Sequence, residues 1–366
     1  MKKTFTPLLF VLLAFRVSST SAQENTGHSN SISITGYVDA YAAYYTDSVG
    51  IGNYQQFPSV SPRSNQFGLN VAMITAKYNA DRLRATVALQ YGDIPRSAWS
   101  GTFNPILEAN AGIRICKELW LDAGFFRTHF GTEGLFPKEN ICNSVSLNTF
   151  YEPYFESGVK LNYNPTEKIA LNIFLLNGYN MFEDNNEKKS FGLLATYTLG
   201  NAGNIGYSNY IGDDSPQGDS VSHLRFHNNL FFNYAVIGWK FQIGGDYCIQ
   251  ENSDIDQPES SASMFSGVVT AKYTIAKKLS AYARYEFFND PNGSMSPRMT
   301  DVQGNLTGFI AWGITGGAEF RPTDNSYIRF EARTLQFDIY QQIFYWNGEQ
   351  TNKRMEAMLN LGVWFE

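Results

Sequence analysis

The sequence predicts an all-β fold, a closed antiparallel transmembrane up-and-down β-barrel of about 16 strands. Three observations lead to this prediction. Apolar and polar residues alternate with a period of two along many segments, which indicates strands with different environments on their two sides. Short turns and long loops alternate along the chain, as in outer-membrane barrels. The composition also excludes membrane-spanning helices.

The last segment, residues 354–366, shows the strand pattern most clearly. An unbroken apolar row alternates with a mostly polar row over a dozen residues, longer than is usual for a strand of a soluble sandwich. We therefore expect the apolar row to face lipid and this strand to pair with the first strand, residues 31–46, so that no strand edge is left open. The apolar row is Met355, Ala357, Leu359, Leu361, Val363 and Phe365.

The connections between the expected strands fall into two classes. Tight turns lie near Asn79, Lys117, Pro165, Asn201, Ala235, Ala276 and Pro322. Long loops lie at 47–65, 93–105, 130–152, 180–189, 213–222, 251–263, 290–306 and 338–352. An even number of strands with both termini on the periplasmic side gives this order, with short periplasmic turns and long outer loops.

Aromatic residues are expected to form two belts on the apolar rows, at the two lipid–water interfaces. The belt near the turns contains Tyr163, Tyr197, Trp239, Tyr273, Phe320 and Phe365. The belt near the loops contains Tyr44, Tyr91, Phe125, Tyr285 and Phe287.

Composition limits the class of protein. Aromatic residues make up 15% and charged residues 17% of the 366 residues, with a mean hydropathy of −0.28. Helical membrane proteins need apolar runs of about 20 residues, whereas a barrel strand exposes only every second residue to lipid. The net charge of −6 argues against a nucleic-acid-binding protein, which carries a concentrated basic face.

The N-terminus predicts export. Two lysines, an apolar run from Leu8 to Phe15 and a small-residue site ending at Ala22 are typical of a cleaved secretory signal peptide. We therefore expect a signal peptide at 1–22, a short periplasmic lead-in at 23–30 and a single barrel at 31–366, located in the outer membrane.

Charged residues on the polar rows are expected to line the barrel interior, because a lipid-facing Arg or Lys at the midplane costs about 2–4 kcal/mol. The signs are nearly balanced, which favours a hydrated channel without strong ion preference, and wall salt bridges are favoured over a dedicated binding site. The series Arg329, Glu331 and Arg333 is a local exception that could favour anions. The pore-lining candidates are Asp39, Arg82, Arg84, Glu108, Arg114, Asp122, Glu156, Lys160, Arg284, Glu286, Arg329, Glu331, Arg333, Arg354 and Glu356.

Catalytic and metal-binding patterns are weak. The histidines show no serine or cysteine partner at a recognisable spacing, and the three cysteines lack zinc-site spacing, so we expect no enzyme activity, no metal and no cofactor. An odd cysteine count does not form a disulfide framework. Whether Cys142 and Cys248 pair is left open.

The loop at 130–152 is unusual because it is long and carries Leu, Phe and Ile residues. One hypothesis is that it folds into the barrel and narrows the pore. The alternative is that it packs against neighbouring loops, since long loops are often ordered by their own side chains.

Several stretches resemble the OmpL-like, porin-2 type family of β-barrel porins. The resemblance is carried by Glu108–Phe126, Tyr151–Lys168, Gly36–Tyr41 and Leu176–Tyr179. It implies an outer-membrane pore protein of a Gram-negative cell.

The favoured function is therefore a porin through which small hydrophilic solutes or ions diffuse passively. The alternatives are a substrate-specific uptake channel for oligosaccharides or anions, which would use interior aromatics, and an outer-membrane enzyme or structural barrel. The expected partners are outer-membrane lipid, the barrel-assembly machinery and small hydrophilic solutes, but no nucleic acid. Analogy with general porins offers a homotrimer, which the sequence does not decide.

Overall fold

The computed structural model of the protein describes residues 30–47, 50–55, 57 and 59–366. The expected signal peptide at 1–22 and most of the lead-in at 23–30 lie outside the described residues. Within the described part, no helix is both long and apolar enough to cross a membrane.

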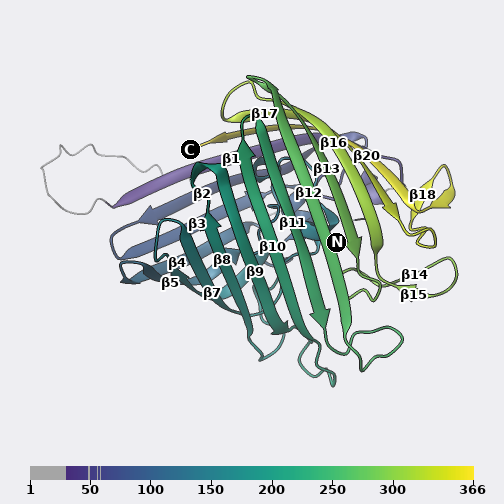
Figure 1. The fold of residues 1–366 in the computed structure, drawn as a ribbon, viewed down its shortest axis with the longest axis horizontal. Coiled ribbons are helices and arrows are strands. Elements are labelled where there is room, and N and C mark those ends of the chain that lie inside the picture. Colours follow the sequence, from purple (N-terminus) through teal and green to yellow (C-terminus); the bar gives the residue numbers. More distant parts are fainter. Residues whose placement is uncertain (1–29, 48–49, 56, 58) are drawn as a thin grey trace, which may run out of the picture.

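Sixteen strands of the described chain form one closed barrel (Figure 1). Neighbours in the sequence are neighbours in the barrel, and every pair is antiparallel, which confirms the predicted fold and strand number. The barrel strands are β1 (Ser31–Tyr45), β2 (Gln66–Asn79), β3 (Leu83–Tyr91), β4 (Ile106–Cys116), β5 (Leu119–Arg127), β6 (Phe155–Tyr163), β7 (Ile169–Leu176), β8 (Ser190–Thr198), β9 (Gly203–Asp213), β10 (Leu224–Val236), β11 (Trp239–Gln250), β12 (Ala262–Ala276), β13 (Leu279–Asn289), β16 (Ile310–Phe320), β17 (Ser326–Phe337) and β20 (Lys353–Phe365).

The C-terminal strand closes the barrel as predicted. β20 pairs with β1 from Gly36↔Phe365 to Tyr45↔Glu356, and with β17 on its other side from Ser326↔Val363 to Gln336↔Lys353. Its apolar row points outward, with Leu359 49% exposed, while Asn360 on the polar row is fully buried.

The long loops carry the remaining elements, except for one 3-10 turn in the short connection between β8 and β9. Two short hairpins extend from the loops between β13 and β16 and between β17 and β20, and the second turns at Asn347 and Gly348, which both have positive φ, as a two-residue hairpin requires. The small elements are β14 (Met299–Thr300), β15 (Leu306–Thr307), β18 (Phe344–Trp346), β19 (Glu349–Thr351), α1 (Asp93–Ala98), α2 (Leu147–Phe150), and the 3-10 turns η1 (Ile51–Asn53), η2 (Pro137–Glu139) and η3 (Gly200–Ala202).

The predicted aromatic belts lie on the outer surface, with one exception. The six residues near the turns are 42–55% exposed, and four of the five near the loops are 37–73% exposed. Phe125 is the exception: it stacks on Phe182 with the ring centroids 4.1 Å apart. Gly124, the residue before Phe125, has a φ of 129°, and the alternation of the strand is interrupted at this point.

Candidate functional site

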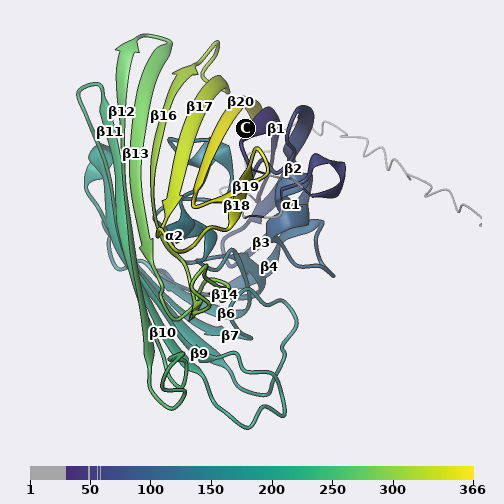
Figure 2. The same cartoon turned by 90° about the vertical axis from the view of Figure 1, so that its right-hand side faces the viewer.

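The segment between β5 and β6, residues 128–154, lies inside the barrel and is called the insert loop below. Every residue from 142 to 149 is buried. Figure 2 shows α2, which belongs to this segment, enclosed by the strands beside β13. The buried position favours the constriction hypothesis for loop 130–152 over packing among outer loops.

Glutamates of the barrel wall hold the insert loop through its backbone. Glu331 on β17 accepts hydrogen bonds from the amides of Asn143 and Ser144, at 2.6 and 2.9 Å. Glu286 on β13 accepts one from the amide of Leu147 at 2.7 Å. Hydrogen bonds to a charged group are worth about 1.5–3 kcal/mol each, so these carboxylates fix the path of the loop.

Arginines of the same wall bind the loop carbonyls. Arg284 on β13 donates to the Ser144 carbonyl at 2.6 Å and to the Ser144 hydroxyl at 2.8 Å. Arg329 on β17 donates to the carbonyls of Pro137 and Cys142, at 2.7 and 3.3 Å. Donors and acceptors of the loop backbone are therefore both satisfied inside the barrel, as buried backbone requires.

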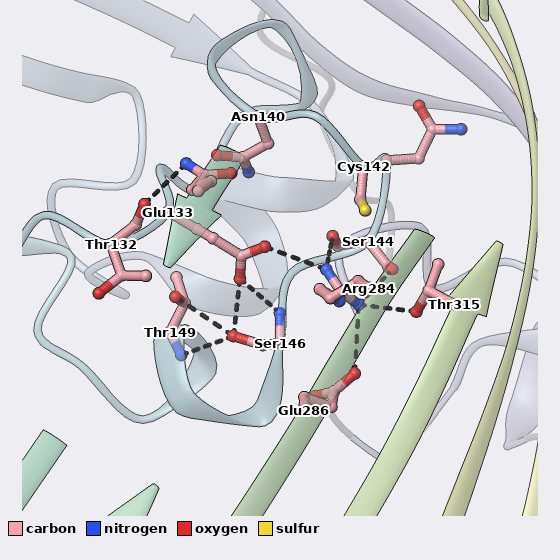
Figure 3. Close-up of polar contacts among 12 residues, drawn as sticks. Thr132, Glu133, Asn140, Cys142, Ser144, Ser146, Thr149, Arg284, Glu286 and Thr315 are labelled. Carbon is pink, nitrogen blue, oxygen red and sulfur yellow. Dashed lines mark hydrogen bonds and ion pairs between the residues drawn. The ribbon is translucent and has the colours of Figure 1, made fainter. Parts of the chain in front are cut away.

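A buried ion pair joins the loop to this anchor. Glu133 of the insert loop pairs with Arg284 at 3.1 Å, and both side chains are fully buried. The other carboxylate oxygen of Glu133 accepts from the amide and hydroxyl of Ser146, which also caps α2 through the Thr149 amide. Figure 3 shows Glu133 and Ser144 joined to Arg284, and Ser146 joined to Glu133 and Thr149.

The opposite wall holds the loop through neutral polar contacts. Asn229 on β10 donates to the Thr132 hydroxyl at 2.9 Å and to Glu152 at 3.1 Å. Gln242 on β11 donates to the Thr132 carbonyl at 2.7 Å, and Ser266 on β12 donates to the Asn148 side chain. Burial, with the nearby carboxylates of Asp246 and Glu133, raises the pKa of Glu152 well above its usual range.

A third attachment comes from β1. The Tyr37 hydroxyl accepts a hydrogen bond from the Lys138 amide at 3.1 Å and lies 2.6 Å from the Tyr327 hydroxyl of β17. Tyr327 in turn donates to Asp39. The insert loop thus spans the lumen from the part of the wall formed by β17, β20 and β1 to β10.

Apolar side chains fill much of the lumen on both sides of the insert loop. One cluster joins the loop to the β1–β6 wall and the loop carrying α1, and contains Leu135, Phe136, Ile94, Trp99 and Phe155. A second cluster joins Leu147 to the β11–β17 wall and the hairpin loops, with Phe288, Phe337 and Phe344. The interior is therefore less hydrated than its polar rows predict.

Two neighbouring cavities lie beside the insert loop. One of about 510 Å³ is lined by Trp99, Thr132 and Tyr154 among others. The other, of about 370 Å³, lies at the turn end of the barrel, by Lys240 and Arg321. Glu139, Asn233 and Gln242 line both, so the two cavities are neighbours along the loop.

The pore-lining candidates from the sequence occupy different positions. Ten are buried: Asp39, Asp122, Glu156, Arg284, Glu286, Arg329, Glu331, Arg333, Arg354 and Glu356. Four are half-buried on the wall: Arg84, Glu108, Arg114 and Lys160. Arg82 is exposed in the turn before β3 begins, and its place in the pore lining stays a prediction.

Most of these charges are paired. Arg84 binds Asp122 at 2.6 Å. Arg333 binds Glu286 through two hydrogen bonds of 2.9 and 2.8 Å. The series Arg329, Glu331 and Arg333 is therefore engaged with the loop and the wall, so it does not present free cations to the lumen.

The interior aromatics considered for a substrate-specific channel also serve as anchors. Tyr41 donates to Asp93 at the start of α1, at 2.9 Å, and Tyr282 donates to Glu331 at 2.9 Å. Both rings are buried. Tyr41 holds the loop that carries α1, whereas Tyr282 binds the wall carboxylate that holds the insert loop, and neither ring is accessible from the lumen.

The three cysteines are free thiols, so Cys142 and Cys248 do not pair in the structure. Cys142 lies in the insert loop with its side chain fully buried, and burial raises the pKa of its thiol well above the usual value. Among the described residues, no group of three or more His, Cys, Asp or Glu side chains is arranged to hold a metal ion.

Several residues at the core of the site were not candidates from the sequence. Glu133, Ser144 and Lys138 lie in a loop, where no alternation marks them. The one usable signal was the apolar content of loop 130–152, which indicated burial but not its partners.

The comparison with solved structures finds outer-membrane channels. The anion-selective porin of Comamonas acidovorans has a TM-score of 0.62 at 10% identity, covering 92% of this chain and all of the porin. The channel DcaP of Acinetobacter baumannii has a TM-score of 0.64 at 12% identity, covering 95% of this chain and all of DcaP. The trimer form of Vibrio cholerae OmpT has a TM-score of 0.56 at 11% identity, covering 92% and 99%. The TM-scores show a shared fold with these channels.

No curated protein sequence matches the chain. A family model does: residues 31–365, the whole barrel, match the family described as "Putative beta-barrel porin-2, OmpL-like". The protein belongs to this family, and is an outer-membrane β-barrel of the porin class.

Proposed function

We propose that the protein lets small hydrophilic solutes diffuse passively across the outer membrane, with the insert loop as the constriction of the channel. The observation that carries the proposal is the anchored loop. It crosses the lumen and is tied to β1, β10, β13 and β17, with two neighbouring cavities beside it. Sixteen-stranded barrels of this class enclose an aqueous channel.

The constriction limits the size of the solute. The apolar clusters fill much of the lumen on both sides of the loop, and the two cavities beside the loop measure only about 510 and 370 Å³. We therefore expect small ions and monosaccharide-sized solutes to pass and larger oligosaccharides to be retained.

We expect no catalytic function. Nucleophilic catalysis needs a nucleophile, a base and a group that orients the base. His223 lies 3.2 Å from the Ser253 hydroxyl, but its same ring nitrogen faces the Glu251 carbonyl at 3.2 Å. A backbone carbonyl there supplies none of the charge that a triad carboxylate gives to the base.

The proposal includes export and assembly. Cleavage at Ala22 would release a mature chain that the barrel-assembly machinery inserts, with outer-membrane lipid contacting the exposed apolar rows. A homotrimer is proposed as the assembly, and the likeness to the OmpT trimer form supports it.

Planar-bilayer recording of purified mature protein, residues 23–366, tests the channel function. We expect discrete ohmic steps, and liposome swelling assays should show faster entry of small sugars than of larger ones. Absence of both current and swelling would refute the proposed function.

Deletion of residues 132–148 tests the constriction. β5 and β6 pair up to Arg127↔Phe155, so a short turn can join them after the deletion. We expect a larger single-channel conductance and entry of larger sugars. Deleting the exposed residues 217–220 between β9 and β10 is the control, which should leave both unchanged. Equal conductance in the two deletions would contradict the constriction.

A further inference from the structure

The cavity of about 370 Å³ at the turn end of the barrel has an unusual charge. Five basic side chains line it: Lys138, Lys240, Lys272, Arg321 and Arg329. Glu139 and Glu319 are its two acidic residues, which leaves a formal surplus of three positive charges, five minus two. This basic vestibule contrasts with the balanced pairing found elsewhere on the wall.

The two carboxylates of the vestibule are already engaged in ion pairs with other residues than Lys138 and Lys240. Glu319 is already shared by Lys272 and by Arg329, the latter at 2.6 Å, with Arg321 at 3.9 Å. Glu139 pairs with Arg127, which does not line this vestibule. In the part of the chain that the structure describes, Lys138 and Lys240 have no ion-pair partner.

The unpaired cations are held close to other cations. Lys240 lies directly opposite Lys272 in the β11–β12 register, and like charges at opposed positions destabilise a sheet. Lys138 and Arg321 both lie over the ring of Trp364, at 5.7 and 5.3 Å from its centroid. These four cations therefore come from the insert loop, two neighbouring strands and a turn, and they converge on one space.

The opposition of Lys240 and Lys272 does not favour barrel stability, because like charges face each other where other wall positions carry ion pairs. An anion in the vestibule would relieve the repulsion, and rings of Lys and Arg are how pores select anions and phosphate. Lysine ammonium and arginine guanidinium groups form charge-assisted hydrogen bonds with oxyanions. The vestibule also falls within the roughly 300–1,000 Å³ of small-molecule sites.

We propose that this vestibule is a binding site for small polyvalent oxyanions, with inorganic phosphate as the simplest member of the class, and that it makes the channel anion-selective. The inference rests on the proposed function only for selectivity, since binding to the vestibule does not require conduction. Lys138 and Lys240 are the specificity-determining residues because they carry charge that no described carboxylate pairs. Arg329 and Lys272 have a second role as anchors and partners of Glu319.

The test replaces the two unpaired lysines together, as Lys138→Gln with Lys240→Gln. The matched control removes two lysines from exposed turns at the same end, as Lys117→Gln with Lys168→Gln. Neither control residue lines the vestibule. Both double variants change the net charge equally, so a general surface-charge effect would move them together.

Two measurements are made on the full barrel. Isothermal titration with inorganic phosphate in detergent measures binding, and the reversal potential in a KCl gradient measures selectivity. We expect the unaltered protein to bind phosphate. The affinity should fall about tenfold or more in the vestibule variant, because the loss of one hydrogen bond to a charged group corresponds to about a factor of ten or more in affinity. The control should bind phosphate as the unaltered protein does. The reversal potential should indicate chloride preference, reduced in the vestibule variant alone.

The outcomes separate the two proposals. Phosphate binding that depends on the two lysines, in a protein that conducts no current, would uphold the site and refute the porin function. Current with no phosphate binding, or with equal effects in both double variants, would overturn the vestibule and leave the porin function standing. If phosphate only bound to surface charge, the control variant would lose as much binding as the vestibule variant.

Discussion

Replacing Arg284 with methionine should release the insert loop from the barrel wall. Arg284 is fully buried, and its guanidinium binds Glu133, Glu286, the Ser144 carbonyl and hydroxyl, and the Thr315 hydroxyl. Methionine has similar bulk but no charge. It leaves Glu133 buried with only its Ser146 contacts, and removing one partner of a buried ion pair costs about 3–5 kcal/mol.

That cost is expected to appear as loop detachment. At about 1.4 kcal/mol per factor of ten, the detached population should rise between about a hundredfold and a few thousandfold. Cys142 reports on it directly, because its thiol is fully buried in the attached loop and burial keeps its pKa high, which suppresses the reactive thiolate. The assay is the rate of Cys142 alkylation in the folded barrel, read by mass spectrometry against the exposed Cys116.

Two controls make the assay decisive. Arg84→Met removes a wall arginine that binds Asp122 and makes no hydrogen bond or ion pair with the insert loop, so Cys142 should stay protected. Adding Glu133→Gln to Arg284→Met removes the orphaned charge and should restore much of the protection. Unchanged protection of Cys142 in a folded Arg284→Met barrel would refute the view that this ion pair holds the loop.

Two further predictions concern pH and closure. Burial, with Asp246 and Glu133, raises the pKa of Glu152. Its protonated form therefore stabilises the attached loop, and this stabilisation is complete below about pH 4.3, the usual pKa of Glu. The stabilisation is lost as the pH rises through the raised pKa. Alkylation of Cys142, normalised to Cys116, should therefore increase with pH in the unaltered protein but much less in Glu152→Gln, and equal pH profiles would contradict the role of Glu152. Removing residues 354–366 deletes almost all of β20, which pairs with both β1 and β17, so heat-modifiable gel mobility should show no folded barrel. Normal insertion of this truncated chain would overturn the role of β20 in closure.

The sequence allowed the barrel to be predicted because its signals are local. The alternation from Met355 to Phe365 assigns each side chain of β20 to lipid or lumen without reference to any other strand. Turn and loop lengths then determine strand order, since each strand of an up-and-down barrel pairs with the next. The family resemblance pointed to the same class, and the match over residues 31–365 confirmed it.

The candidate site was predicted only in part. Interior charges such as Arg284, Glu286 and Glu331 could be placed on the lumen side from alternation alone. Their partners could not, because Glu331 binds Asn143 and Ser144, which lie almost 190 residues away in the chain. No periodic pattern encodes such contacts.

By itself, the sequence determined the membrane environment, the strand number and the closing role of β20, since each follows from short-range periodicity and from the need to satisfy backbone amides in lipid. The tertiary structure alone decided where the insert loop goes and which interior charges stay unpaired. Pairing depends on the path of an irregular loop across the lumen, and that path is fixed by long-range hydrogen bonds to Glu286, Arg284 and Glu331. Lys138 and Lys240 stand out as a pair only once that path brings them to the same vestibule.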